Sequence, residues 1–99
     1  MDTFPEIDIL LTEPARLRLL TLLSMIRRAV FTFLLYQSGM TRGNLSVQMS
    51  RLSDANIVNV EKSFQGNRPR TVYELNEHGR AALRRYKAGM KEILGVLPD

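Results

Sequence analysis

The chain has 99 residues, of which 44% are hydrophobic and 24% charged, and its formal net charge is +4. This length suffices for one compact core, and the composition resembles neither a disordered tail nor a low-complexity linker. We therefore expect a single domain over residues 1–99. The chain has no cysteine and one histidine, which excludes disulfides, thiol catalysis and clustered metal ligands, so no metal and no cofactor is expected.

The charge is unevenly distributed along the chain. All 14 basic residues follow Pro14, whereas four of the ten acidic residues precede it. Such a basic excess suits a polyanionic partner, although a merely solvated surface would look similar. The apolar runs are much shorter than the roughly 20 residues of a membrane span, and the acidic start is unlike a secretory signal. We therefore expect a soluble, cytoplasmic protein.

The first predicted helix runs from Glu13 to Ile26 and carries a broad apolar stripe. Thr12 is its expected N-cap, and Pro14 lies in the first turn, where a missing N–H costs nothing. The short apolar segment from Ile7 to Leu11 should dock on the core.

Two more helices are predicted before residue 56. Ala29 to Ser38 forms the first, and Gly39 suits the left-handed residue that ends it. Thr41 is the expected N-cap of the next helix, at about residues 41–55. The core face of this third helix follows the i, i+4, i+7 pattern and consists of Leu45, Met49 and Leu52.

After Asn56 the apolar pattern changes from helical to alternating. Val58, Val60 and Phe64 share one face of a predicted strand, and Thr71 to Leu75 alternates in the same way. The QGNRPR segment between them is rich in turn formers, so the two strands form a hairpin at about residues 57–75.

The last predicted helix, at about residues 77–97, has Asn76 as its cap and an apolar a/d seam. This seam either folds back on its own domain or pairs with a second copy. Because so small a domain cannot easily bury it, we favour a homodimer. The predicted interface consists of Leu83, Tyr86, Met90, Ile93 and Leu97.

This order of elements predicts an α+β, mainly α fold: a winged helix-turn-helix domain with a two-stranded wing and a C-terminal dimerisation helix. The helix after the turn would enter the major groove of double-stranded DNA. Arg42 and Gln48 are the preferred base readers and Arg51 a phosphate contact, although a solvated helix face would also be polar. The predicted contacts on this helix are Arg42, Asn44, Ser46, Val47, Gln48 and Arg51.

The hairpin is the more telling element, because its turn concentrates positive charge. Lys62, Arg68 and Arg70 would lie along the DNA backbone or in the minor groove, which attracts arginine where it is narrow. The alternative is a hairpin that charge merely makes soluble. A solubilising loop could equally use Asp, Ser or Glu, so the exclusive use of basic residues favours contact with nucleic acid.

Three blocks of sequence carry a family resemblance: EPARLRLLTLL, TRGNLSVQMSRLSDANIVNVEKSF and RPRTVYELNEHGRAAL. They resemble winged helix transcriptional regulators related to the MarR and ArsR groups. Asn56 replaces the usual Gly and Asn76 the usual Thr, and asparagine can adopt the left-handed conformation and can cap a helix. The resemblance implies a homodimer on a pseudopalindromic operator. It also implies a small-molecule effector between the dimer helices and the reading heads, although no residue identifies one.

Three other functions fit the sequence less well. An enzyme is not expected, because the chain has no nucleophile with a base, no paired carboxylates and no phosphate-binding glycine loop. A winged helix that binds an acidic protein in place of DNA would have the same fold. Binding of the basic last helix to an anionic membrane is a weaker alternative, because its cations equally suit a solvated flank.

Overall fold

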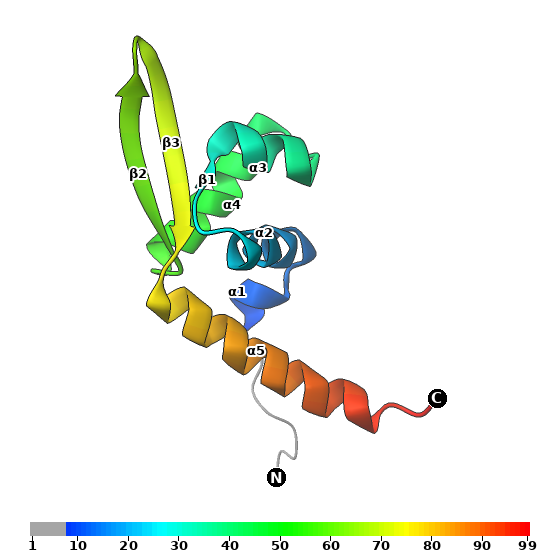
Figure 1. Ribbon diagram of the computed structural model, residues 1–99. Helices are drawn as coiled ribbons and strands as arrows, with labels where there is room; N and C mark the ends of the chain where they lie inside the picture. Colours follow the sequence, from blue (N-terminus) through cyan, green and yellow to red (C-terminus); the bar gives the residue numbers. More distant parts are fainter. Residues whose placement is uncertain (1–7) are drawn as a thin grey trace.

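The computed structural model describes residues 8–99, which form helices around one side of a small antiparallel sheet (Figure 1). The predicted α+β, mainly α winged helix fold is confirmed. In chain order the elements are α1 (Ile9–Thr12), α2 (Pro14–Met25), β1 (Ala29–Val30), α3 (Phe31–Ser38), α4 (Arg42–Asp54), β2 (Val58–Gln65), β3 (Arg68–Leu75) and α5 (Glu77–Val96).

The predicted two-stranded wing is confirmed, but the sheet has the order β1-β3-β2, so a third strand was missed. The first two residues of the predicted 29–38 helix are a short strand, because Ala29 pairs with Tyr73 and Val30 with Val72. Such a pairing depends on residues that are distant in the chain. Local periodicity therefore could not reveal it.

The wing is the long hairpin of β2 and β3, which rises away from the helices (Figure 1). The first residue pair of the hairpin is Val58 with Leu75, and the last is Gln65 with Arg68. A loop of two residues joins the strands. Gly66 starts this loop with a φ of 64°, the conformation that a type II′ turn requires of its first loop residue.

The start of α2 differs from the prediction in its cap. Glu13, and not Thr12, is the N-cap, and its carboxylate accepts hydrogen bonds from the backbone N–H groups of Ala15 and Arg16. The reason is steric, because a residue that precedes proline is pushed out of the helical conformation. Thr12 instead ends α1, whose Leu11 is buried as predicted; Ile7 lies outside the described residues.

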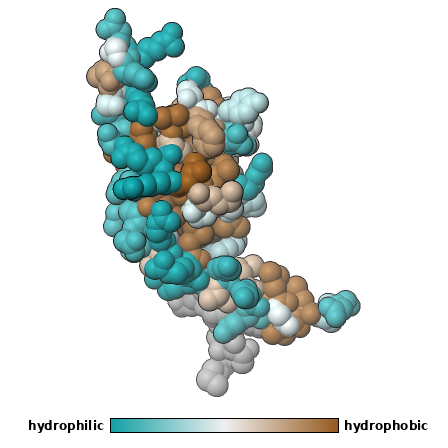
Figure 2. Space-filling model, viewed as in Figure 1, coloured by the Kyte–Doolittle hydropathy of each residue, from teal (hydrophilic) through white to brown (hydrophobic). Residues whose placement is uncertain are grey.

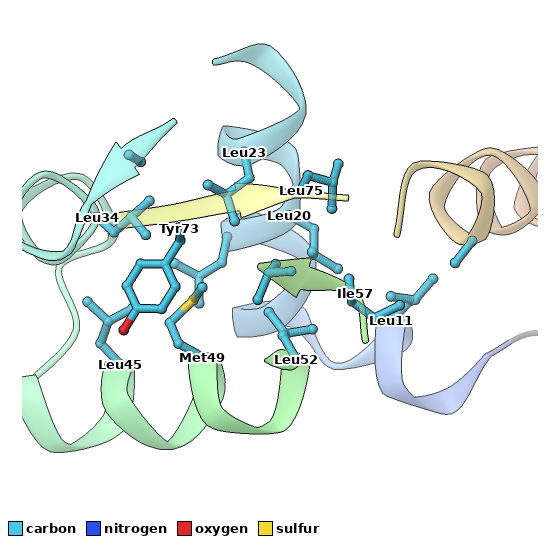
Figure 3. Close-up of a cluster of buried hydrophobic side chains, with 14 residues drawn as sticks. Leu11, Leu20, Leu23, Leu34, Leu45, Met49, Leu52, Ile57, Tyr73 and Leu75 are labelled. Carbon is cyan, nitrogen blue, oxygen red and sulfur yellow. The ribbon is translucent and has the colours of Figure 1, made fainter. Parts of the chain in front are cut away.

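The core lies between the helices and the inner face of the sheet (Figure 3). The predicted core face of α4 is confirmed, since its three residues have 1% exposure or less. Tyr73 and Leu75 from β3 close the core from the other side. The side chains that are completely buried are Leu11, Leu19, Leu20, Leu23, Leu34, Leu45 and Leu52.

The chain leaves α4 through a Schellman motif. The Ile57 N–H donates to the Leu52 carbonyl at 2.9 Å, and the Asn56 N–H donates to the Ser53 carbonyl at 3.0 Å. Asn56 has a φ of 58°, which confirms its predicted left-handed conformation. Burial of Ile57 and Leu52 in the same core cluster completes the motif and fixes where the wing begins.

The first turn of α5 packs against that same corner. Asn76 caps α5 as predicted, since its Oδ1 accepts from the Gly79 N–H at 2.7 Å. Its Nδ2 donates to the Asn56 carbonyl at 2.9 Å, and its backbone N–H donates to the Ile57 carbonyl at 3.1 Å. We call this set of contacts among Asn56, Ile57, Asn76 and Gly79 the α4–α5 joint.

Gly79 leaves no room for a side chain at this joint, because a Cβ would lie 2.2 Å from the Ile57 carbonyl oxygen. The Ile57 carbonyl can make room for a methyl group only if the backbone of the joint moves. Gly79→Ala should therefore lower the free energy of unfolding by about 2–3 kcal/mol in urea denaturation. Gly43→Ala is the matched control, since nothing lies within 4 Å of its Cβ position. The control should be stabilised by about 0.5–1 kcal/mol. Equal stability of the two variants would contradict the role of Gly79.

Candidate nucleic-acid interface

The helix α4 presents one polar face to solvent and one apolar face to the core. Thr41 is its N-cap as predicted, with its hydroxyl accepting from the Asn44 N–H at 3.1 Å. Because the core holds the helix through the opposite face, the outward side chains project together from a rigid element. The exposed predicted contacts are Arg42, Asn44, Ser46, Val47 and Arg51.

Gln48 is less free than the sequence suggests, because it is half-buried. Its Nε2 donates to Asn44 Oδ1 at 3.4 Å, and its Oε1 is buried with no hydrogen-bond donor among residues 8–99. The two amides therefore form a pair on α4. To contact a base edge, Gln48 must rotate or act through Asn44.

Arg42 is oriented by an aromatic side chain at the start of α3. Its guanidinium lies 5.8 Å from the centre of the Phe31 ring, close enough for a cation–π interaction. Phe31 in turn lies 6.5 Å from Tyr73, centre to centre. These contacts turn Arg42 toward the wing, a placement that the sequence did not predict.

A hollow of about 570 Å³ separates the wing from the starts of α3 and α4. Arg42, Arg68 and Arg70 all line it, so side chains far apart in sequence are brought to one concave surface. Its remaining lining residues are Val30, Phe31, Thr32, Gln65, Pro69 and Thr71. Three arginine residues that line an open hollow suit an anionic group such as a phosphate.

Lys62 lies on the side of the wing that faces α4. It lines a second hollow, of about 270 Å³, together with Ser46 and Ser50. Arg51 lies at the other end of α4, toward the start of α2, where its charge acts on Glu13. The predicted contacts thus divide into a group near the wing and Arg51 apart from it.

The wing departs from the prediction at Phe64. The alternation is correct, since Val58 is buried and Val60 half-buried on the same face, but Phe64 is 75% exposed. The two strands extend beyond the helices before they reach this position, so no core side chain lies opposite Phe64. Alternation predicts the face of a residue, whereas its burial depends on what lies opposite.

The predicted dimer seam divides into two parts. Leu83 and Tyr86 are half-buried because they pack against the core of their own chain. Met90 and Ile93 are also half-buried but lie beyond that core cluster, and Leu97 is 62% exposed. The heptad pattern missed the exposed apolar residues Leu94 and Val96, at 55% and 67% exposure. It excluded them because it follows a single stripe of the helix.

Two other kinds of site are absent from the described part of the chain. From residue 8 onward, no three His, Cys, Asp or Glu side chains gather closely enough to hold a metal ion. Over the same residues, no helix is long and apolar enough to cross a membrane.

Comparison with known proteins agrees with this geometry. Residues 15–94 match the family described as the winged helix DNA-binding domain. The chain therefore belongs to that family. No curated protein sequence is significantly similar to it.

Three solved structures illustrate the similarity. A transcriptional regulator homologue from Pyrococcus horikoshii OT3 has a TM-score of 0.80 at 28% identity, over 87% of this chain and 85% of its own. The antimony-specific repressor AntR has a TM-score of 0.63 at 28% identity, over 87% and 72%. The MarR family regulator Sco3205 from Streptomyces coelicolor, solved in complex with DNA, has a TM-score of 0.66 at 22% identity.

The match to Sco3205 covers 86% of this chain but only 57% of Sco3205, so the chain spans little more than half of that protein. The predicted resemblance to winged helix regulators of the MarR group is confirmed at the level of the fold.

Glu13 gives a prediction about pH. The N–H groups of Ala15 and Arg16 hold the pKa of its carboxyl below the ordinary 4.5, and the charges of Arg16 and Arg51 add to this. A lowered pKa in the folded state stabilises the fold above pH 4.5, and the stabilisation is lost as the pH falls through the folded-state pKa. Glu13→Gln should therefore lower the urea midpoint at neutral pH.

The difference between Glu13→Gln and the parent chain should shrink as the pH falls below 4.5. Glu92→Gln, which removes a carboxylate from an exposed position on α5, is the control. A difference for Glu13→Gln that did not change with pH would contradict this account.

Proposed function

We propose that the chain is a cytoplasmic, homodimeric transcriptional regulator that binds double-stranded DNA in a sequence-specific manner. The observation that carries the proposal is the hollow in which Arg42, at the start of α4, meets Arg68 and Arg70 of the wing. A phosphate backbone between the wing and α4 would contact all three, while α4 entered the major groove. The family and the fold support this use of the surface.

Within this proposal the contacts have different roles. Lys62, Arg68, Arg70 and Arg51 supply phosphate contacts and thus affinity, with the wing arginines also able to follow a narrow minor groove. Arg42, which the sequence favoured as a base reader, is assigned to the phosphate contacts instead, because it lies over Phe31 and lines the hollow beside the wing. Sequence choice belongs to the outward face of α4. Its hydrogen-bonding side chains can read base edges, and the half-exposed Val47 can contact a thymine methyl group. The base-reading set is Asn44, Ser46, Val47 and Gln48.

An effector, as the family resemblance implies, would bind outside this surface. A cleft of about 250 Å³ lies where α2, β3 and α5 meet, next to the α4–α5 joint. Arg80, Arg84 and Lys87 contribute three cations to its wall, so the effector would be a small anion.

The rival function is a winged helix that binds an acidic protein, and salt dependence separates the two. Binding to a duplex should weaken steeply as salt rises, and each phosphate contact contributes about 0.9 to the logarithmic slope. Arg68→Ala and Arg70→Ala should each flatten the slope by about one unit in a gel-shift or anisotropy titration. Arg85→Ala, on α5, should leave it unchanged. Failure to bind any duplex at low salt would exclude DNA binding.

Dimerisation is supported by the free end of α5, which runs away from the body (Figure 1) and gathers apolar side chains (Figure 2). Light scattering should give twice the chain mass of 11.3 kDa. Leu97→Lys, at an exposed position, and Met90→Lys should shift the protein toward monomer because each buries a charge in the interface. Glu92→Lys is the matched control, and a monomer for the parent chain at high concentration would exclude the dimer.

The same dimer has a consequence for the operator. Sequences selected from a random DNA pool should contain two half-sites about one helical turn apart, in inverted orientation. A single, unrepeated half-site among the selected sequences would contradict binding as a symmetric dimer.

A further inference from the structure

The tip of the wing carries an aromatic ring where a solvated hairpin would carry a polar side chain. Phe64 is 75% exposed, and the register places it directly opposite Pro69, which is also exposed. Two apolar side chains thus sit side by side on one face of the tip. Figure 2 shows a hydrophobic spot there, surrounded by hydrophilic surface.

This apolar pair faces the same side as α4. Side chains alternate between the faces of a strand, so Phe64 shares its face with Lys62 two residues before it. Lys62 lines the hollow beside Ser46 and Ser50 of α4, which identifies that face as the inner one. Phe64 therefore lies on the side of the wing from which a duplex bound to α4 would approach.

The reach and charge of the wing suit a nucleic acid at this point. Phe64 lies four residues beyond Val60, the last residue of β2 that the body half-covers, which is about 13 Å at 3.3 Å per residue. From Lys62 to Tyr73 the wing contains no acidic residue and has three basic ones. Lys62 shares the inner face with Phe64, whereas Arg68 and Arg70 leave β3 on the opposite face. An apolar pair with cations on both faces of the hairpin complements a groove walled by phosphates.

We infer that Phe64, supported by Pro69, is an apolar wedge that enters the minor groove next to each half-site. There it packs against the sugars and partly unstacks one base step, while Arg68 and Arg70 hold the flanking phosphates. Apolar wedges of this kind kink the duplex, so the wing would favour steps that deform easily. The inference rests on the proposed function and adds to it a readout of DNA deformability.

The test uses the full chain and a duplex selected by it from the random pool. Phe64→Ala should bind about tenfold more weakly, because burying a phenylalanine side chain is worth on that order. The bend, measured by energy transfer between the duplex ends, should decrease. The salt slope should not change, since no phosphate contact is lost. Phe64→Leu, which keeps an apolar wedge, should retain most of the bend.

Two controls separate insertion of the ring into the groove from a general loss of aromatic surface. Tyr36→Ala removes an aromatic ring that is 84% exposed on α3 and should change neither affinity nor bend. 2-Aminopurine placed at successive steps beyond the half-site should brighten at one step with the parent chain, and stay dim with Phe64→Ala.

The outcomes distinguish this inference from the proposed function. If the parent chain selects and binds no duplex, both fail. If it binds but Phe64→Ala matches it in affinity, bend and fluorescence, only the wedge is overturned. If Phe64→Ala changes the mass measured by light scattering without DNA, the ring contacts a second copy of the chain, and the wedge is again overturned.

Discussion

The α4–α5 joint is the constraint on which the geometry of the candidate nucleic-acid interface depends. At one corner the Schellman motif ends α4, β2 begins, and Asn76 and Gly79 fix the start of α5 against Ile57. Because backbone groups, a glycine and the short side chain of Asn76 make the contact, no long side chain is available to absorb a shift. The directions of α4, the wing and α5 are therefore determined together.

This arrangement has a consequence for how two reading heads would be placed. In a dimer held by α5, the angle at the joint sets the separation of the two α4 helices, and with it the spacing of the half-sites. A small anion in the cleft would bind Arg80, Arg84 and Lys87, which follow Gly79 of the joint along α5. Because the joint ties the start of α5 to the end of α4, an anion that rotated α5 would also shift α4, which in the proposed function is the helix that contacts DNA.

The features that sequence reasoning predicted are those with a local physical cause. Thr41, Gly39 and Asn56 end or begin helices through their own conformation or hydrogen bonds, and all three behave as predicted. The strand β1 and the exposure of Phe64 depend on distant segments, so periodicity could not reveal them. The Glu13 cap is different, because the proline after it was a readable signal that the helix could not begin earlier.

The placement of acidic residues explains how a chain of net charge +4 can present a far more positive surface. Glu61 lies on the outer face at the root of the wing and pairs with Arg28, while Glu13 caps α2. An exposed ion pair of this kind adds little stability, so its main effect is on the electrostatic potential around the wing. It cancels a negative charge that would otherwise oppose Lys62 and the wing arginines. The wing tip and the outward face of α4 from Arg42 to Ser53 are left with basic and neutral groups, as a surface that approaches phosphates requires.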